Sequence, residues 1–101
     1  MKTSFKNIRL DDAEKRALLL SLNDIDGDVY MFGSRLNKEK KGGDIDLLIF
    51  SKKNSLGLSQ NIRRRFFMEC EEKIDVLVFD KNLLTQDQEA FINTLRLTRI
   101  K

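Results

Sequence analysis

Residues 28–50 read DVYMFGSRLNKEKKGGDIDLLIF and hold two short apolar segments joined by a polar, basic loop. The first segment, 28–32, is β-branched and aromatic and ends at Gly33, so we predict a strand there. The second segment, 44–50, is apolar on both faces after its two acids, which is typical of a strand covered on both sides. We expect the loop over 37–43 to be flexible, with a short helical turn near its start.

A helix is predicted before these strands and a third strand after them. Asp11 and Glu14 match a capping box, which favours a helix over 11–25 that Gly27 ends. Its apolar residues recur at helical spacing. They are Ala13, Ala17, Leu18, Leu22 and Ile25. The segment KIDVLVF, residues 73–79, predicts the third strand.

Two further helices complete the predicted order of elements. One is expected over 59–72 with Ser59 as its cap, and Thr85 with Gln88 forms the capping box of the other. The last helix supplies three core candidates, which are Phe91, Ile92 and Leu95. The order αβ(α)βαβα predicts an α/β (or α+β) domain with a small β-sheet flanked by helices.

Composition limits the chemistry that this chain can perform. Its 101 residues fit a single domain, 1–101. The net charge of +3 and pI near 9.1 suit a polyanionic small molecule, and we do not expect direct nucleic-acid binding. The absence of histidine excludes Ser-His and Cys-His catalysis and histidine-ligated zinc. A single cysteine, Cys70, excludes an intrachain disulfide.

The same sequence indicates a cytoplasmic protein. Residues 1–12 have no apolar core of a secretory signal, and the apolar run at 17–20 is far too short to span a bilayer. Together with the lone cysteine, these features predict a cytoplasmic location and no membrane partner.

Three aspartates on two predicted strands form the candidate catalytic and metal site. Side chains alternate along a strand, so Asp44 and Asp46 should point the same way, roughly 7 Å apart at the backbone. Asp75 lies near the start of the third strand and joins them if the two strands are neighbours. Three such carboxylates repel one another unless divalent cations separate them, and Mg²⁺ prefers hard oxygen ligands. We therefore predict two Mg²⁺ ions at Asp44, Asp46 and Asp75.

The turn after the first strand is the candidate triphosphate site. Gly33 has no Cβ and allows the backbone to approach a phosphate closely. Ser34 offers a hydroxyl and an N–H group, and a helical turn starting there would direct its amides at the anion. Arg35 adds positive charge beside the turn.

The strings FGSR and GGDIDLLI, with a third Asp on a later strand, resemble the DNA polymerase β-type nucleotidyltransferase superfamily. The small size is similar to its minimal nucleotidyltransferase (MNT) branch, which includes the MntA-like antitoxins of HEPN/MNT modules. The resemblance covers roughly 10–79. It implies that Gly33 and Ser34 contact a triphosphate and that Asp44, Asp46 and Asp75 bind the metals. Asp75 would also help to activate the acceptor hydroxyl.

The resemblance also implies an activity and a partner. The chain would move NMP, in the first instance AMP from ATP, onto a hydroxyl of a HEPN-domain toxin and release pyrophosphate. Two alternatives stay open. The chain could neutralise its partner by occlusion with an inactive site, or it could modify a small molecule as a homo-oligomer.

A basic run inside the second predicted helix has no assigned role. Arg63, Arg64 and Arg65 are consecutive, and consecutive helical residues splay by about 100° each. We therefore predict a solvated face and not a single patch.

Overall fold

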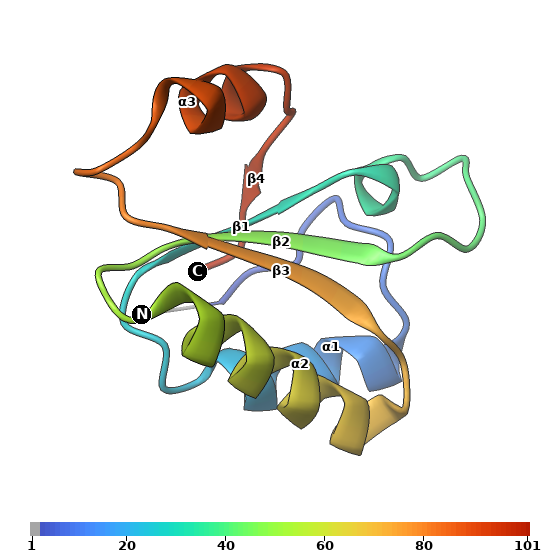
Figure 1. Cartoon of the computed structure of the whole chain (residues 1–101). Coiled ribbons are helices and arrows are strands. Elements are labelled where there is room, and N and C mark those ends of the chain that lie inside the picture. Colours follow the sequence, from blue (N-terminus) through green and yellow to red (C-terminus); the bar gives the residue numbers. More distant parts are fainter. Residues whose placement is uncertain (1–2) are drawn as a thin grey trace.

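The computed structural model describes residues 3–101 and confirms the predicted fold class, a mixed sheet flanked by helices. The elements, in chain order, are α1 (Asp12–Leu22), β1 (Asp28–Phe32), the 3₁₀ turn η1 (Ser34–Leu36), β2 (Ile45–Phe50), α2 (Ser55–Cys70), β3 (Ile74–Phe79), α3 (Gln86–Asn93) and β4 (Thr98–Arg99). Figure 1 shows α1 and α2 together on one face of the sheet and α3 on the other.

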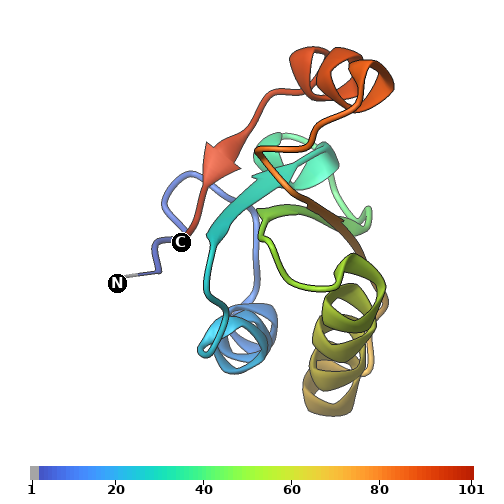
Figure 2. The same ribbon diagram turned by 60° about the vertical axis from the view of Figure 1, so that its left-hand side comes forward.

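The four strands follow the order β3-β2-β1-β4. β1 runs antiparallel to both β2 and β4, whereas β2 and β3 are parallel and are joined through α2. A parallel pair requires such a crossover, and a helix is its usual form. β3 is consequently an edge strand, and β2 lies in the interior of the sheet (Figures 1 and 2).

Alternation along the strands separates the core from the site. The inward side chains pack against α1 and α2, and the strand residues in this buried cluster are Val29, Met31, Ile45, Leu47, Ile49, Ile74, Val76 and Val78. The intervening residues, including Asp46 and Asp75, therefore point to the face that carries α3. The three predicted strands are confirmed as β1, β2 and β3, although β2 begins at Ile45 and leaves Asp44 just before it.

The two longer helices differ from their predicted bounds. α1 has the predicted capping box at Asp11 and Glu14, but it ends at Leu22 and not at Ile25. α2 begins at Ser55, because the Asn54 side chain accepts a hydrogen bond from the N–H of Gly57 at 2.8 Å. The predicted cap at Ser59 is therefore wrong.

The C-terminal third also departs from prediction. α3 has its predicted capping box, formed by Thr85 and Gln88, yet none of its residues is buried. The prediction of Phe91, Ile92 and Leu95 as core residues is therefore wrong. Phe91 instead packs edge-on against Phe32, with ring centroids 6.2 Å apart. β4 was not predicted, since two residues are too few to show a strand pattern. Among residues 3–101, no helix has the length and apolar character needed to cross a membrane.

Candidate active site

Asp46 and Asp75 lie side by side on the face of the sheet that carries α3. They are register partners in the parallel β2–β3 pair, and Phe32 is the partner of Asp46 on its other side. Register partners point to the same face, so the two carboxylates project together. Asp46 is half-buried and Asp75 is exposed.

This proximity changes the protonation of Asp46. Burial raises the pKa of the Asp46 carboxyl to about 6, together with the negative charge of Asp75, a hydrogen bond with Asp75 and the charge of Asp44. Without a cation, the two neighbouring carboxylates thus resist simultaneous ionisation, as expected of a pair that shares one site.

Asp44 approaches the pair from the end of the 37–43 loop. It is exposed and precedes β2, and its charge is the smallest contribution to the raised pKa of Asp46. The oxygens of Asp44, Asp46 and Asp75 are not gathered as a set within 4.8 Å of one another. The structure thus brings Asp46 and Asp75 together and leaves Asp44 at their border.

Gly33 lies against the Asp46 carboxylate in the turn after β1. Its φ of 85° lies in the region that favours glycine, and a Cβ at this position would overlap the Asp46 oxygen Oδ2. The turn after β1 therefore touches the carboxylate directly, which only a residue without a side chain allows.

Ser34 and Gly43 form a second close contact beside Gly33. Ser34 starts η1, and a Cβ on Gly43 would overlap the Ser34 hydroxyl oxygen. The end of the 37–43 loop therefore folds back over the turn. As a result, residues that are ten apart in sequence, Ser34 and Asp44, border one small region next to Asp46.

A comparison with known protein families identifies the family of this chain. The family model described as "Nucleotidyltransferase domain" matches residues 13–97. The chain belongs to the nucleotidyltransferase domain family. No curated protein matched the chain.

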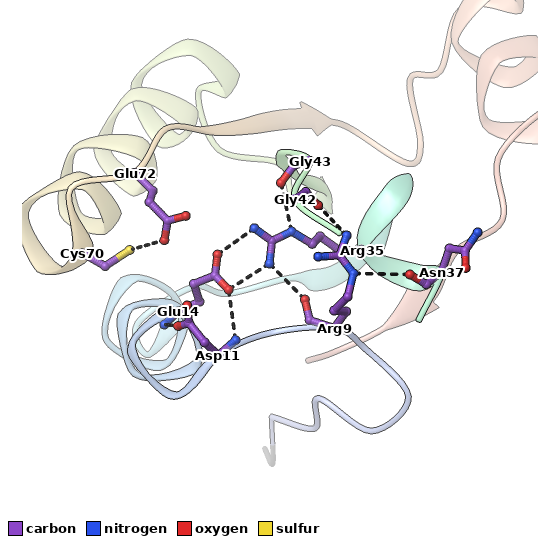
Figure 3. Close-up of polar contacts among 9 residues, drawn as sticks. All are labelled: Arg9, Asp11, Glu14, Arg35, Asn37, Gly42, Gly43, Cys70 and Glu72. Carbon is purple, nitrogen blue, oxygen red and sulfur yellow. Dashed lines mark hydrogen bonds and ion pairs between the residues drawn. The ribbon is translucent and has the colours of Figure 1, made fainter. Parts of the chain in front are cut away.

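In this nucleotidyltransferase, the Arg35 side chain points to Glu14 in α1 and to the backbone of Arg9 and Gly43 (Figure 3). Its guanidinium is buried and donates two hydrogen bonds of 2.8 Å to the Glu14 carboxylate in α1. It also donates to the backbone oxygens of Arg9 and Gly43, both at 3.0 Å. These bonds fasten the loop end to α1, so Arg35 supports the site from behind.

Two supporting residues were missed by sequence reasoning. Arg9 donates through its guanidinium to the backbone oxygens of Asn37 and Gly42, at the two ends of the loop. Glu14 was recognised only as a capping residue, whereas it is buried and also pairs with Arg35. Neither role carries a local signal, because the partners are separated by 21 to 33 residues.

A different acidic cluster lies behind the loop. Among residues 3–101, oxygens of Asp11, Glu14 and Glu72 lie within 4.8 Å of one another. Burial would raise the pKa of Glu14, but the hydrogen bonds from Arg35 and Asp11 outweigh it and lower that pKa. Arg35 and the capping box therefore already bind Glu14 and Asp11, and Cys70 donates to Glu72 (Figure 3), so this cluster is not the predicted trio.

Proposed function

We propose that this chain is a Mg²⁺-dependent nucleotidyltransferase that moves NMP, most simply AMP from ATP, to a hydroxyl group of a protein partner. Family membership shows the nucleotidyltransferase class. The specific proposal rests above all on one observation, the paired Asp46 and Asp75 carboxylates beside the Gly33 turn.

The donor set fits divalent cations. Asp44, Asp46 and Asp75 offer only hard carboxylate oxygens, and the raised pKa of Asp46 reflects burial first and then neighbouring negative charge, which a cation would balance. In our proposal these three residues hold two Mg²⁺ ions. Such ions neutralise phosphate charge and polarise the attacking and leaving oxygens of an in-line displacement.

The order of residues across the sheet suggests how the two substrates are placed. Gly33 and Ser34 would contact the triphosphate through backbone N–H groups and the Ser34 hydroxyl. Asp75, on the other side of Asp46, would accept a hydrogen bond from the acceptor hydroxyl and orient its oxygen. Asp75 would take up the hydroxyl proton as that oxygen bonds to the α-phosphorus. The bond from the α-phosphorus to the bridging oxygen breaks, and pyrophosphate leaves with its electron pair. Arg35 and Arg9 have their donors on protein oxygens, so we assign them to holding the loop.

The partner in this proposal is a HEPN-domain protein in the cytoplasm. This assignment comes from the resemblance of FGSR and GGDIDLLI to antitoxins of the MNT branch. A HEPN-type reading frame beside the gene for this chain would support it.

The test replaces metal ligands and follows both binding and transfer. Wild type should gain thermal stability with Mg²⁺ and ATP together, by about 2.7 kcal/mol at a hundredfold excess over Kd. The Asp44→Asn, Asp46→Asn double variant should lose this gain. It should also fail to label a co-expressed HEPN partner from α-labelled ATP, while the complex still forms.

The matched control is Asp80→Asn, which changes a carboxylate just beyond the opposite end of β3. It should keep nucleotide binding and transfer. Mass spectrometry of the partner detects each transferred AMP as a covalent increment. If the partner stays unmodified but is neutralised by both wild type and the double variant, the enzyme proposal is wrong and the chain acts by occlusion.

A further inference from the structure

A groove of about 490 Å³ lies between α2 and the start of β3. Phe67, Met68 and Ile74 provide its apolar surface. Ile74 is buried, but Phe67 is 48% exposed and Met68 is 76% exposed. Large neighbouring apolar side chains left open to solvent mark an interaction site more often than isolated ones do.

Cations border the same groove. Arg63 and Arg64 come from α2, and Lys73 precedes β3. Of the three consecutive arginines, only Arg65 diverges from the others as predicted. Its guanidinium lies near the end of α1 and pairs with Asp24 at 2.7 Å. Arg63, Arg64 and Lys73 take part in none of the ion pairs formed within the described residues. The groove therefore combines an apolar floor with three cationic side chains that form no ion pair among the described residues, next to the single carboxylate of Asp75.

The groove also reaches the candidate active site. Asp75 is part of its lining, and the Asp75 carboxylate lies beside that of Asp46. Across the sheet, the Gly33 turn is on one side of Asp46 and the groove is on the other. A triphosphate on the turn thus leaves the groove free for the second substrate.

The strand at this border can take a partner. Within residues 3–101, β3 pairs with β2 alone, so its outer edge presents backbone N–H and C=O groups without a neighbouring strand in this part of the chain (Figure 1). An extended peptide can add to such an edge, with its side chains entering the adjoining pockets.

We propose that the α2–β3 groove docks an acidic polypeptide segment of the acceptor protein, in which an aromatic or other large apolar side chain fills the groove and carboxylates face Arg63, Arg64 and Lys73. The inference deepens the proposed function, on which it rests, by naming the chemistry of the acceptor segment. The segment brings its hydroxyl to Asp75 along the β3 edge.

The test uses a fluorescent random copolymer of glutamate and tyrosine as the probe, measured by anisotropy without ATP or metal. Wild type should bind it, and should bind a lysine–tyrosine copolymer at least tenfold more weakly. Phe67→Asp with Met68→Asp, and separately Arg63→Glu with Arg64→Glu, should each weaken binding roughly tenfold or more, as for central interface residues.

Two control variants match these changes outside the groove. Leu56→Asp alters another exposed apolar residue of α2, and Lys52→Glu reverses an exposed charge. Both should bind the probe within twofold of wild type. Hydrogen exchange should show protection on binding in the amides of 63–68 and 73–79. Protection elsewhere, or equal losses in the control variants, would overturn the proposal.

Other occupants give different results. A groove for nucleic acid would bind labelled oligo(dT) better than the acidic copolymer and would depend on the arginines but not on Phe67 and Met68. A groove that joins two copies of this chain would show a dimer in sedimentation that Met68→Asp dissociates. Either result, or no copolymer binding by wild type, would overturn the proposal.

The docking groove and the proposed function can be tested separately. Copolymer binding needs neither ATP nor the metal ligands, so Asp44→Asn with Asp46→Asn should bind the probe as wild type does. If the probe binds but Mg²⁺ and ATP do not stabilise the protein, the docking proposal is supported and the proposed function is contradicted. If Mg²⁺ and ATP stabilise the protein but the probe does not bind, the proposed function is supported and the docking proposal is contradicted.

Discussion

At the scale of single residues, ionised Asp46 destabilises the metal-free fold, whereas the proposed function needs its negative charge. Its pKa of about 6, against an ordinary 3.8, means that the folded state binds a proton that the unfolded state has released between those pH values. The metal-free protein therefore loses stability as pH rises through that window. A group that destabilises the fold when it is ionised is typical of a site that awaits a charged ligand.

Asp46→Asn should therefore stabilise the metal-free protein at pH 8, by on the order of 1–2 kcal/mol after allowance for partial exposure. At pH 4 the gain should largely disappear, because the wild-type carboxyl is then mostly protonated in the folded state. Urea unfolding in EDTA at both pH values measures this. A gain of equal size at pH 4 and pH 8 would show that the charge of Asp46 is not its cause.

Gly33 shows what sequence can and cannot reveal about a residue. The Gly-Ser turn was recognisable because glycine and serine after a short apolar segment favour a turn. That Gly33 touches Asp46 was not recognisable, since the contact depends on the antiparallel register of β1 and β2. The candidate site residues were predicted from residue type, spacing and the family resemblance, while their mutual geometry required the sheet.

At the scale of elements, the 37–43 loop is held to α1 by a buried ion pair. Arg35→Met would leave the Glu14 carboxylate buried without its guanidinium, which should lower the free energy of unfolding by about 3–5 kcal/mol. Adding Glu14→Met should restore much of this loss, because apolar replacements of a buried pair are often tolerated. Urea denaturation of the single and double variants measures both effects.

The exposed pair Asp24–Arg65 is the matched control for this comparison. Arg65→Met should shift the unfolding midpoint far less, since exposed ion pairs contribute little. Equal effects of Arg35→Met and Arg65→Met would mean that burial of the pair does not govern its contribution.

Prediction succeeded where the signals within an element were local. The capping boxes of α1 and α3 were found because four adjacent residues define each one. The start of α2 was missed because Asn54, Ser55 and Gly57 are residue types that favour turns, whereas in the structure Asn54 caps the helix. α3 looked like a core helix because Phe91 and Ile92 are apolar, but none of its residues is buried, and Phe91 packs edge-on against Phe32.

At the scale of the whole molecule, the C-terminal residues join three distant segments. The Ile100 N–H donates to Val29 in β1 at 2.9 Å, and its carbonyl accepts from the N–H of Ser4 at 2.9 Å. Lys101 donates through its amine to Ile25 at 2.9 Å and to the Leu22 carbonyl at the end of α1. None of this was predicted, because the pairing of β4 depends on contacts about 70 residues away in sequence.

Ile100→Ala should therefore lower the free energy of unfolding by about 2–4 kcal/mol, as for other buried aliphatic residues. The side chain is 1% exposed, so its removal leaves a cavity among β1, α1 and the N-terminal segment. Leu83→Ala, which changes a 75% exposed side chain, should have almost no effect in the same thermal and urea measurements. A small effect at Ile100 would show that the C-terminal residues pack loosely.

Because side chains alternate between the two faces of β2, a mutation that shifts this strand affects the candidate site and the core together. Leu47 and Ile49 face α1 and α2 while Asp46 faces the side that carries α3, so inserting or deleting one residue would exchange the two sets. Mutations that change length should therefore be purged from this strand and tolerated in the 37–43 loop. Descendants of this gene can acquire new acceptors by altering loops and the α2–β3 groove, while the six positions of β2 stay in phase.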